Sequence, residues 1–153
     1  MKARIRGAAV IVHNDGIIFA RHEDDPRAPR GFNFWSPPGG GVENDETILQ
    51  AAEREAMEEV SLRVVAERPI YAQELISPAY RNRTLELFIL CRLADGESLD
   101  HLKADHEISE ATLLTRATAT GHRILPEVFA ETVWDDLDRG FAEFRYLGLA
   151  RTS

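Results

Sequence analysis

The order of apolar patterns along this chain most restricts the folds open to it, because strand-like segments stand on both sides of one helical segment. Residues 5–12 and 17–20 are apolar and rich in β-branched side chains, and Asn14-Asp15-Gly16 between them is a strong turn signal. Residues 47–60 instead place apolar side chains at helical spacing, in a stripe of Leu49, Ala52, Ala56 and Val60. The first segment predicts a β-hairpin and the second a helix.

The second half of the chain predicts further strands and a terminal helix. Residues 63–74 and 84–92 have strand composition, with Pro69 marking an edge or a bend, and residues 111–114 are a short apolar stretch. The terminal helix is expected to end before Gly140, and its apolar face consists of Val128, Phe129, Val133, Trp134 and Leu137.

Polar or Gly- and Pro-rich segments predict loops at residues 23–34, 37–41 and 93–107. No repeat of roughly 20 to 50 residues and no linker rich in Pro, Gly or Ser divides the chain. We therefore expect a single domain over residues 1–153, with an α/β (α+β) fold in which a mixed sheet is packed between helices.

Composition excludes several classes of protein. The net charge of −8 disfavours a general grip on the phosphate backbone of nucleic acids. Cys91 is the only cysteine, which excludes an internal disulfide and any CxxC metal or redox site. No apolar run reaches the roughly 18 residues that a membrane-spanning helix needs, and the chain starts without a cleavable apolar segment. We expect a soluble, cytoplasmic protein with no membrane partner and no extended nucleic-acid surface.

Three carboxylates gather on one face of the predicted helix. Glu55, Glu58 and Glu59 stand at i, i+3 and i+4, where like charges destabilise a helix by a few tenths of a kcal/mol per pair. A hard divalent cation such as Mg²⁺ or Mn²⁺ prefers oxygen ligands and would offset this repulsion. The alternative for an isolated acidic cluster is a solvated helix face.

The acidic helix is part of a longer pattern. Five residues separate Gly40 from Glu46, seven separate Glu46 from Arg54-Glu55, and two separate that pair from Glu58-Glu59. This spacing, with the segment WSPPGGGVE before it, resembles the signature of the Nudix hydrolase family, G-x5-E-x7-R-E-U-x-E-E-x-G-U, in which U is a bulky aliphatic residue. The sequence departs from that pattern at Ser61, which replaces the glycine, and at Ala56, which replaces the bulky aliphatic residue.

The resemblance implies a Nudix-like α/β/α fold and Mg²⁺-dependent (or Mn²⁺-dependent) hydrolysis of a pyrophosphate bond in a nucleoside diphosphate linked to another group, X. It implies that Arg54 orients a catalytic glutamate, whereas taken alone this arginine reads as an exposed ion pair with Glu58. The implied metal-binding residues are Gly40, Glu55, Glu58 and Glu59. The alternative function is a non-catalytic nucleotide-binding regulatory domain on the same fold.

Three roles stay open at this point. Either Glu58 on the helix or an acid on a distant loop is the catalytic base, and Glu107 is the loop acid we favour over Glu110, although an inert loop acid is equally compatible. Glu46 can cap the helix or act as a partner for its dipole, and the resemblance implies that it supports the glycine loop and the metal site; the two roles are compatible. Ser61 either adopts the left-handed conformation that glycine favours or closes the helix through its hydroxyl group.

Residues that select the substrate must lie outside the pattern. Arginines in the loop before it and at the turn between the later strands can meet phosphates, and aromatic rings can stack on a base. Core packing or a solvated turn is the alternative for each of them. The candidates are Arg27, Arg30, Phe32, Phe34, Trp35, Tyr80, Arg81 and Arg83, of which Arg27, Arg30, Trp35 and Arg81 are favoured. The partner we expect is a nucleotide-type small molecule, and a homodimer is compatible with the sequence.

Overall fold

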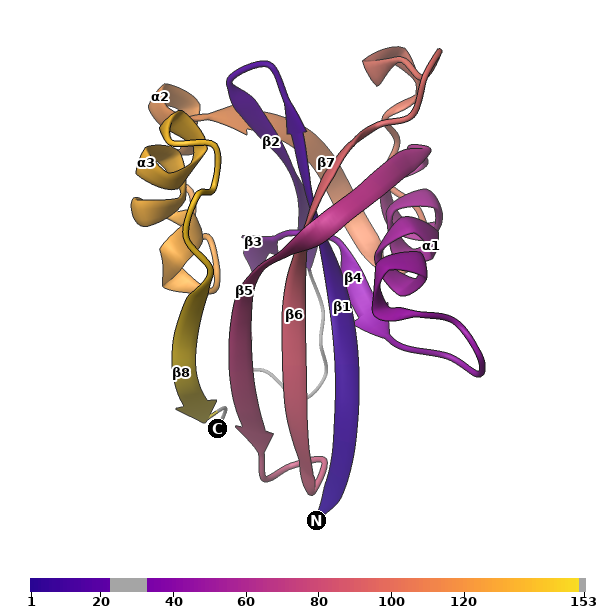
Figure 1. The fold of residues 1–153 in the computed structure, drawn as a ribbon, viewed down its shortest axis with the longest axis vertical. Coiled ribbons are helices and arrows are strands. Elements are labelled where there is room, and N and C mark those ends of the chain that lie inside the picture. Colours follow the sequence, from indigo (N-terminus) through magenta and orange to yellow (C-terminus); the bar gives the residue numbers. More distant parts are fainter. Residues whose placement is uncertain (23–32, 152–153) are drawn as a thin grey trace.

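The protein folds into an eight-stranded mixed sheet with helices on both sides (Figure 1). The structure is a computed structural model that describes residues 1–22 and 33–151. The strands are β1 (Lys2–His13), β2 (Gly16–His22), β3 (Phe34–Ser36), β4 (Gly39–Gly41), β5 (Val64–Ser77), β6 (Asn82–Leu93), β7 (Ile108–Thr115) and β8 (Arg145–Arg151). The helices are α1 (Ile48–Val60), α2 (Arg116–Ala119) and α3 (Thr132–Asp138), with 3-10 turns η1 (Leu99–His101) and η2 (Glu127–Phe129). The predicted mixed sheet between helices is confirmed.

The strands follow the order β3-β2-β1-β6-β5-β8, while β4 pairs with β1 and β7 pairs with β2. β1 runs parallel to β6 from Lys2↔Asn82 to Val12↔Arg92, and β8 runs parallel to β5. The remaining pairs are antiparallel. The ends of β1, β6, β5 and β8 extend past the helices at the bottom of Figure 1. Within the described ranges, no helix is long and apolar enough to cross a membrane.

The predicted hairpin is confirmed, with a turn of two residues between His13 and Gly16. Asn14 supplies the positive φ of this turn, at 54°. Gly16 serves close packing instead, because a Cβ atom there would lie 2.7 Å from Cγ of Leu113 on β7. The turn signal was therefore located correctly, but asparagine and not glycine provides the unusual backbone conformation.

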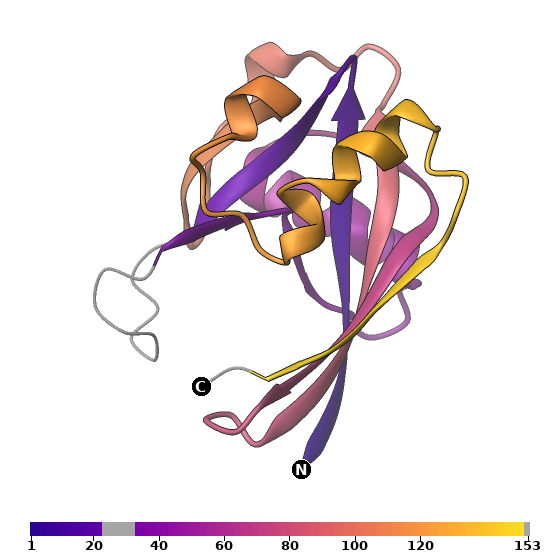
Figure 2. The ribbon, with the colours of Figure 1, turned by 90° about the vertical axis from the view of Figure 1, so that its left-hand side faces the viewer.

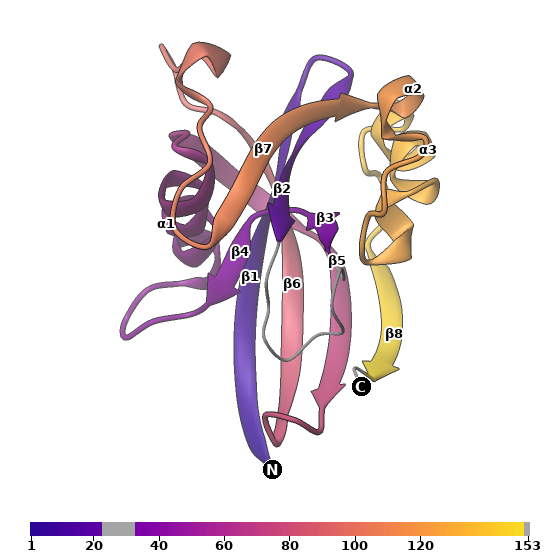
Figure 3. The same cartoon turned by 180° about the vertical axis from the view of Figure 1, so that it is seen from behind.

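Two hydrophobic clusters fill the space on either side of the sheet. One lies under α3 and η2 and contains Phe19, Tyr71, Phe88, Phe129 and Trp134 among others. The second lies under α1, where the buried Ala52, Ala56 and Val60 meet sheet residues that include Ile11, Ile18 and Ile89. Figures 2 and 3 show α1 and α3 on opposite faces of the sheet. The small residues of the predicted helical stripe allow α1 to approach the strands closely.

Four expectations about local structure are corrected. Residues 39–41 form β4, because pairing with Arg6 to Ala8 of β1 supplies the hydrogen bonds that a glycine run does not favour by itself. The terminal helix is divided into η2 and α3, and periodicity misses the break because residues on both sides of it enter one core cluster. The loop predicted at 93–107 contains the turn η1, and the loop predicted at 23–34 already gives way to β3 at Phe34.

The edge strand β8 and the short helix α2 are absent from the sequence prediction. A partly buried ion pair holds β8 in place: Arg145 donates to both Asp136 carboxylate oxygens, at 2.8 and 2.7 Å, and the Tyr71 hydroxyl group donates to Oδ2 at 2.6 Å. The hydrogen bonds from Arg145 lower the pKa of Asp136, while burial raises the pKa of Tyr71. Side chains from β5 and β8 are therefore fixed to one carboxylate on α3.

Candidate active site

Helix α1 has well-defined ends, which fix the direction of its acidic face. Thr47 is the N-cap, with its Oγ1 accepting from the Gln50 amide and the Gln50 side chain accepting from the Thr47 amide. Glu46 is therefore not the cap, and its carboxylate turns toward Arg54 instead. The helix ends at Ser61 with φ 63° and ψ 28°, so serine adopts the left-handed conformation here, and its hydroxyl group also donates to the Lys103 carbonyl at 3.0 Å.

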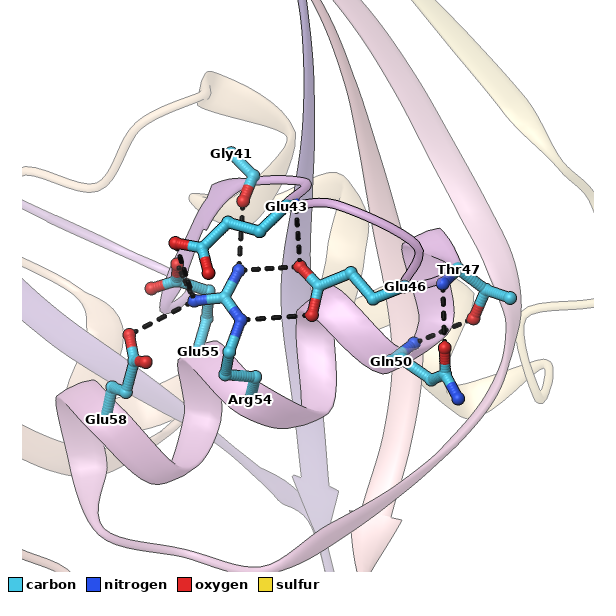
Figure 4. Close-up of polar contacts among 8 residues, drawn as sticks. All are labelled: Gly41, Glu43, Glu46, Thr47, Gln50, Arg54, Glu55 and Glu58. Carbon is cyan, nitrogen blue, oxygen red and sulfur yellow. Dashed lines mark hydrogen bonds and ion pairs between the residues drawn. The ribbon is translucent and has the colours of Figure 1, made fainter.

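Arg54 connects helix α1 to strand β4 and to Glu46, which precedes the N-cap (Figure 4). Its Nε and Nη2 donate to both oxygens of Glu46, at 3.1 and 2.8 Å, and Nη2 also donates to the Gly41 carbonyl at 3.0 Å. Nη1 donates to Glu55 at 2.9 Å and to Glu58 at 3.2 Å. The hydrogen bond to Glu46 is the main reason that the pKa of Arg54 is raised. Arg54 therefore binds Glu46, Gly41 and Glu55 in addition to Glu58, so the exposed i, i+4 ion pair with Glu58 does not describe it fully.

Gly40 and Glu55 occupy adjoining space. A Cβ atom at Gly40 would overlap the Glu55 carboxylate, whose Cδ atom would lie only 2.5 Å away. Burial raises the pKa of Glu55, against the opposing effect of Arg54. A glycine is required at position 40 because any side chain would displace this carboxylate.

Glu59 is the most enclosed of the three helix carboxylates. The residue is 8% exposed, and its Oε1 accepts from the Gly39 amide at 2.7 Å. Burial raises the pKa of Glu59 to about 7, with a further increase from the charge of Glu55. A cation beside this group would favour its charged form and offset the cost of burying the charge.

The three carboxylates line one cleft of about 540 Å³. Its lining residues in the described part of the chain are Arg4, Arg6, Gly39, Gly40, Gly41, Val42, Glu43, Glu55, Glu58, Glu59, His106 and Glu107. The sequence predicted Gly40, Glu107 and the three helix glutamates as site residues, and the fold brings them together. The two loop acids differ in position. Glu107 lines the cleft, whereas Glu110 does not and pairs with Arg21 at 3.0 Å.

The predicted substrate-binding residues are distributed elsewhere. Trp35 is buried in the core cluster under α3 and lies edge-on to His122, so core packing accounts for it. Arg81 is exposed at the turn between β5 and β6 and is not part of the cleft lining. Arg27 and Arg30 lie outside the described residues.

The chemistry of the donor set fits a divalent cation, although no three acidic, histidine or cysteine side chains in residues 1–22 and 33–151 converge on one point as a ready metal cluster. Arg54 holds Glu55 and Glu58, and Gly39 holds Glu59. All three groups are oxygen donors on one cleft, and burial penalises the charge of two of them. Hard divalent cations take this kind of ligand set.

The site analysis from sequence missed the two arginines of β1. Arg4 and Arg6 line the same cleft as the acidic helix, and Arg6 donates from Nε to Glu86 at 2.8 Å. The alternation Arg4-Ile5-Arg6, at the start of the first apolar segment, was a signal, since residues i and i+2 of a strand point to the same side. What the sequence did not provide was the pairing of β1 with β4, which places this strand next to the glycine run.

Comparison with known proteins identifies the family and the fold of the chain. The model of the NUDIX domain matches residues 3–132 of the chain. A NUDIX hydrolase from Nitrosomonas europaea is 20% identical, with a TM-score of 0.76, covering 99% of this chain and 81% of that one. An ADP-ribose pyrophosphatase from Streptococcus suis is 20% identical, with a TM-score of 0.64 and coverage of 96% and 98%. A UDP-X diphosphatase is 16% identical, with a TM-score of 0.66 and coverage of 98% and 68%.

Proposed function

This chain belongs to the NUDIX family and is a Nudix hydrolase, and we propose that it hydrolyses a pyrophosphate bond in a nucleoside diphosphate linked to another group, in a reaction that depends on Mg²⁺ or Mn²⁺. The observation that carries the proposal is the meeting of Glu55, Glu58, Glu59 and Glu107 on one cleft. Arginine side chains line the same cleft, so it presents both metal-binding and phosphate-binding chemistry.

The residues proposed to hold the cation are Glu55, Glu58 and Glu59, with the Gly40 carbonyl as a further oxygen donor. When bound, such a cation neutralises charge on the phosphates and lowers the pKa of a coordinated water molecule. The binding of a cation to these carboxylates also accounts for the otherwise unfavourable burial of Glu55 and Glu59.

Arg54 is proposed as a positioning residue. Its guanidinium connects Glu46 and Gly41 to Glu55 and Glu58, so it fixes these helix carboxylates relative to the glycine strand. Glu58 has the most accessible of the three helix carboxylates, with 38% of its side chain exposed. We assign Glu58 the role of a metal ligand and general base, and Glu107 that of an additional acidic group from the loop before β7.

The experiment that tests the function is a screen of nucleoside triphosphates, nucleotide sugars and dinucleoside polyphosphates for product release that requires Mg²⁺. On the best substrate, Glu58→Gln is expected to lower turnover by about 100-fold or more, since it removes one negative ligand while the helix is kept. Glu53→Gln is the matched control. It lies on the same helix outside the cleft, and glutamine retains the oxygen that accepts from the Ala66 amide.

Release of products at the same rate with Mg²⁺ and with a chelator would contradict the proposal. A Glu58→Gln enzyme within about threefold of its parent would show that this glutamate is neither ligand nor base. The role of Glu107 is tested separately by comparing Glu107→Ala with Glu110→Ala. Only the first is expected to change the Mg²⁺ dependence, and equal, negligible effects of the two would remove the loop from the mechanism.

A further inference from the structure

The cleft has a basic wall that the proposed catalytic groups do not use. Arg4 and Arg6 are two residues apart on β1 and therefore project from the same side of the strand. Both line the cleft that the three helix glutamates also line. Because the chain has a net charge of −8, two arginines beside one acidic site are not explained by a generally basic surface.

Arg6 is already committed to a partner within the protein. Its Nε donates to Glu86 at 2.8 Å, and both side chains are largely buried. Burial lowers the pKa of Arg6, but Glu86, followed by Glu59 and Glu55, raises it on balance. Arg6 therefore lies in the electrostatic field of the proposed metal-binding carboxylates and is neutralised by a buried glutamate.

Arg4 differs from Arg6 in having no such partner. Among residues 1–22 and 33–151 its side chain takes part in no hydrogen bond or ion pair, and the residue is exposed. Its Nη2 atom lies 3.1 Å from the position that a Cβ atom on Gly41 would take, so the guanidinium rests against the glycine strand. Two residues along a strand span about 6.6 Å, which places Arg4 roughly one such step farther along the strand than Arg6.

We propose that Arg4 binds a phosphate group of the substrate that lies outside the hydrolysed linkage. This inference rests on the proposed function, in which the helix glutamates would hold a cation that neutralises charge on the hydrolysed linkage. A guanidinium beyond them recognises one more phosphate by charge-assisted hydrogen bonds. The enzyme then prefers substrates in which X is itself a phosphate, such as nucleoside triphosphates, over nucleotide sugars, in which X is uncharged.

The kinetic test compares pairs of substrates that differ only in X, for example ATP and ADP-ribose, with the corresponding pairs for the other bases. The parent enzyme is expected to show the higher kcat/KM on the triphosphate. Arg4→Gln is expected to lower kcat/KM for the triphosphate by about 10-fold or more, mainly through KM, because a charge-assisted hydrogen bond to the extra phosphate is lost; 10-fold corresponds to about 1.4 kcal/mol. The same variant stays within about threefold of the parent on the nucleotide sugar.

Lys2→Gln is the matched control, because Lys2 lies on the same strand, carries the same charge and is not in the cleft lining. Arg4→Lys should recover part of the lost preference. The inference is overturned if the parent enzyme prefers the nucleotide sugar. It is also overturned if Arg4→Gln lowers kcat/KM by the same factor on both members of a pair, or on neither. Each of these results leaves the hydrolase function in place.

Binding of inorganic tripolyphosphate in the presence of Mg²⁺, measured by calorimetry, gives a readout that does not depend on turnover. Arg4→Gln is expected to weaken this binding by about 10-fold, and Lys2→Gln by less than about twofold. If no substrate is hydrolysed by any variant, the proposed function fails. The calorimetric binding of tripolyphosphate then tests the inference about Arg4 by itself, and equal affinities of the parent and Arg4→Gln would refute it.

Discussion

Ser61 offers the sharpest test of how this helix differs from the family pattern. An L-residue in the left-handed conformation costs about 1–2 kcal/mol, and Ser61 adopts it at φ 63°. Glycine avoids this cost but loses about 0.4–1 kcal/mol through the greater freedom of the unfolded chain. We therefore expect Ser61→Gly to be about 1 kcal/mol more stable than Ser61→Ala, which retains the strained Cβ atom.

The serine hydroxyl group adds a second contribution of opposite sign. It donates to the Lys103 carbonyl at 3.0 Å in an exposed position, and a bond of this kind contributes about 0.5–1 kcal/mol. Ser61→Ala is thus expected to lose about 0.5–1 kcal/mol relative to the parent, and Ser61→Gly to lie within about 0.5 kcal/mol of it. Relief of strain and loss of the hydrogen bond nearly cancel in the glycine variant.

The measurement is urea unfolding of the three proteins at equal m-value. Ser109 is the control, because its hydroxyl group also donates to a backbone carbonyl, that of Arg21 at 3.3 Å, while it lies in β7 without a positive φ. At that position glycine is expected to be less stable than alanine. The reasoning is refuted if Ser61→Gly is no more stable than Ser61→Ala, or if the two sites show the same order.

Three further predictions concern the cleft and the β8 anchor. Because burial raises the pKa of Glu59 from 4.5 to about 7, the metal-free native state retains a proton that the unfolded chain has lost, so stability falls as pH rises through this window, by about 3 kcal/mol at most. Glu59→Gln should remove this slope in unfolding series with a chelator, and parallel pH profiles would contradict it. Asp136→Asn should cost about 2 kcal/mol by urea unfolding, less than a fully buried pair because Arg145 is 34% exposed; a loss below about 0.5 kcal/mol would contradict the anchor. Gly40→Ala should displace Glu55 and lower Mg²⁺-dependent turnover by about 100-fold with the fold retained, whereas near-parental turnover would show that this carboxylate tolerates displacement.

Local signals made the hairpin and α1 predictable from sequence. The turn at Asn14 and the stripe of small apolar residues act within a few neighbours along the chain, although the N-cap is Thr47 and not the Glu46 that the sequence suggested. The sequence spacing predicted Glu55, Glu58 and Glu59 on one helix face, and all three line the same cleft. These features depend on contacts between residues that are close together in the sequence, so a local pattern predicts them.

Elements that depend on distant partners were not predictable in this way. β4 consists of three glycines with no strand preference of their own, and it is a strand because β1 pairs with it. In β6 the sequence predicts the strand but not which side of it is buried. Its polar Thr84 and Glu86 are buried while Leu85 is 41% exposed, the reverse of the usual alternation. Glu86 is buried because Arg6, on another strand, pairs with it.

The parallel pairing of β1 with β6 also makes one charge pair beside the cleft a late contact during protein synthesis. β1 and α1 leave the ribosome early, but Arg6 and its partner Glu86 are 80 residues apart in the chain. At about 5–20 residues per second, the growing chain waits about 4–16 s between the two. For that interval the apolar β1 lacks its longest neighbour in the sheet, and Arg6 lacks the carboxylate that neutralises it. The nascent chain therefore carries Arg6 and the whole acidic helix pattern before Glu86 and the last residues of the cleft lining, His106 and Glu107, have been made.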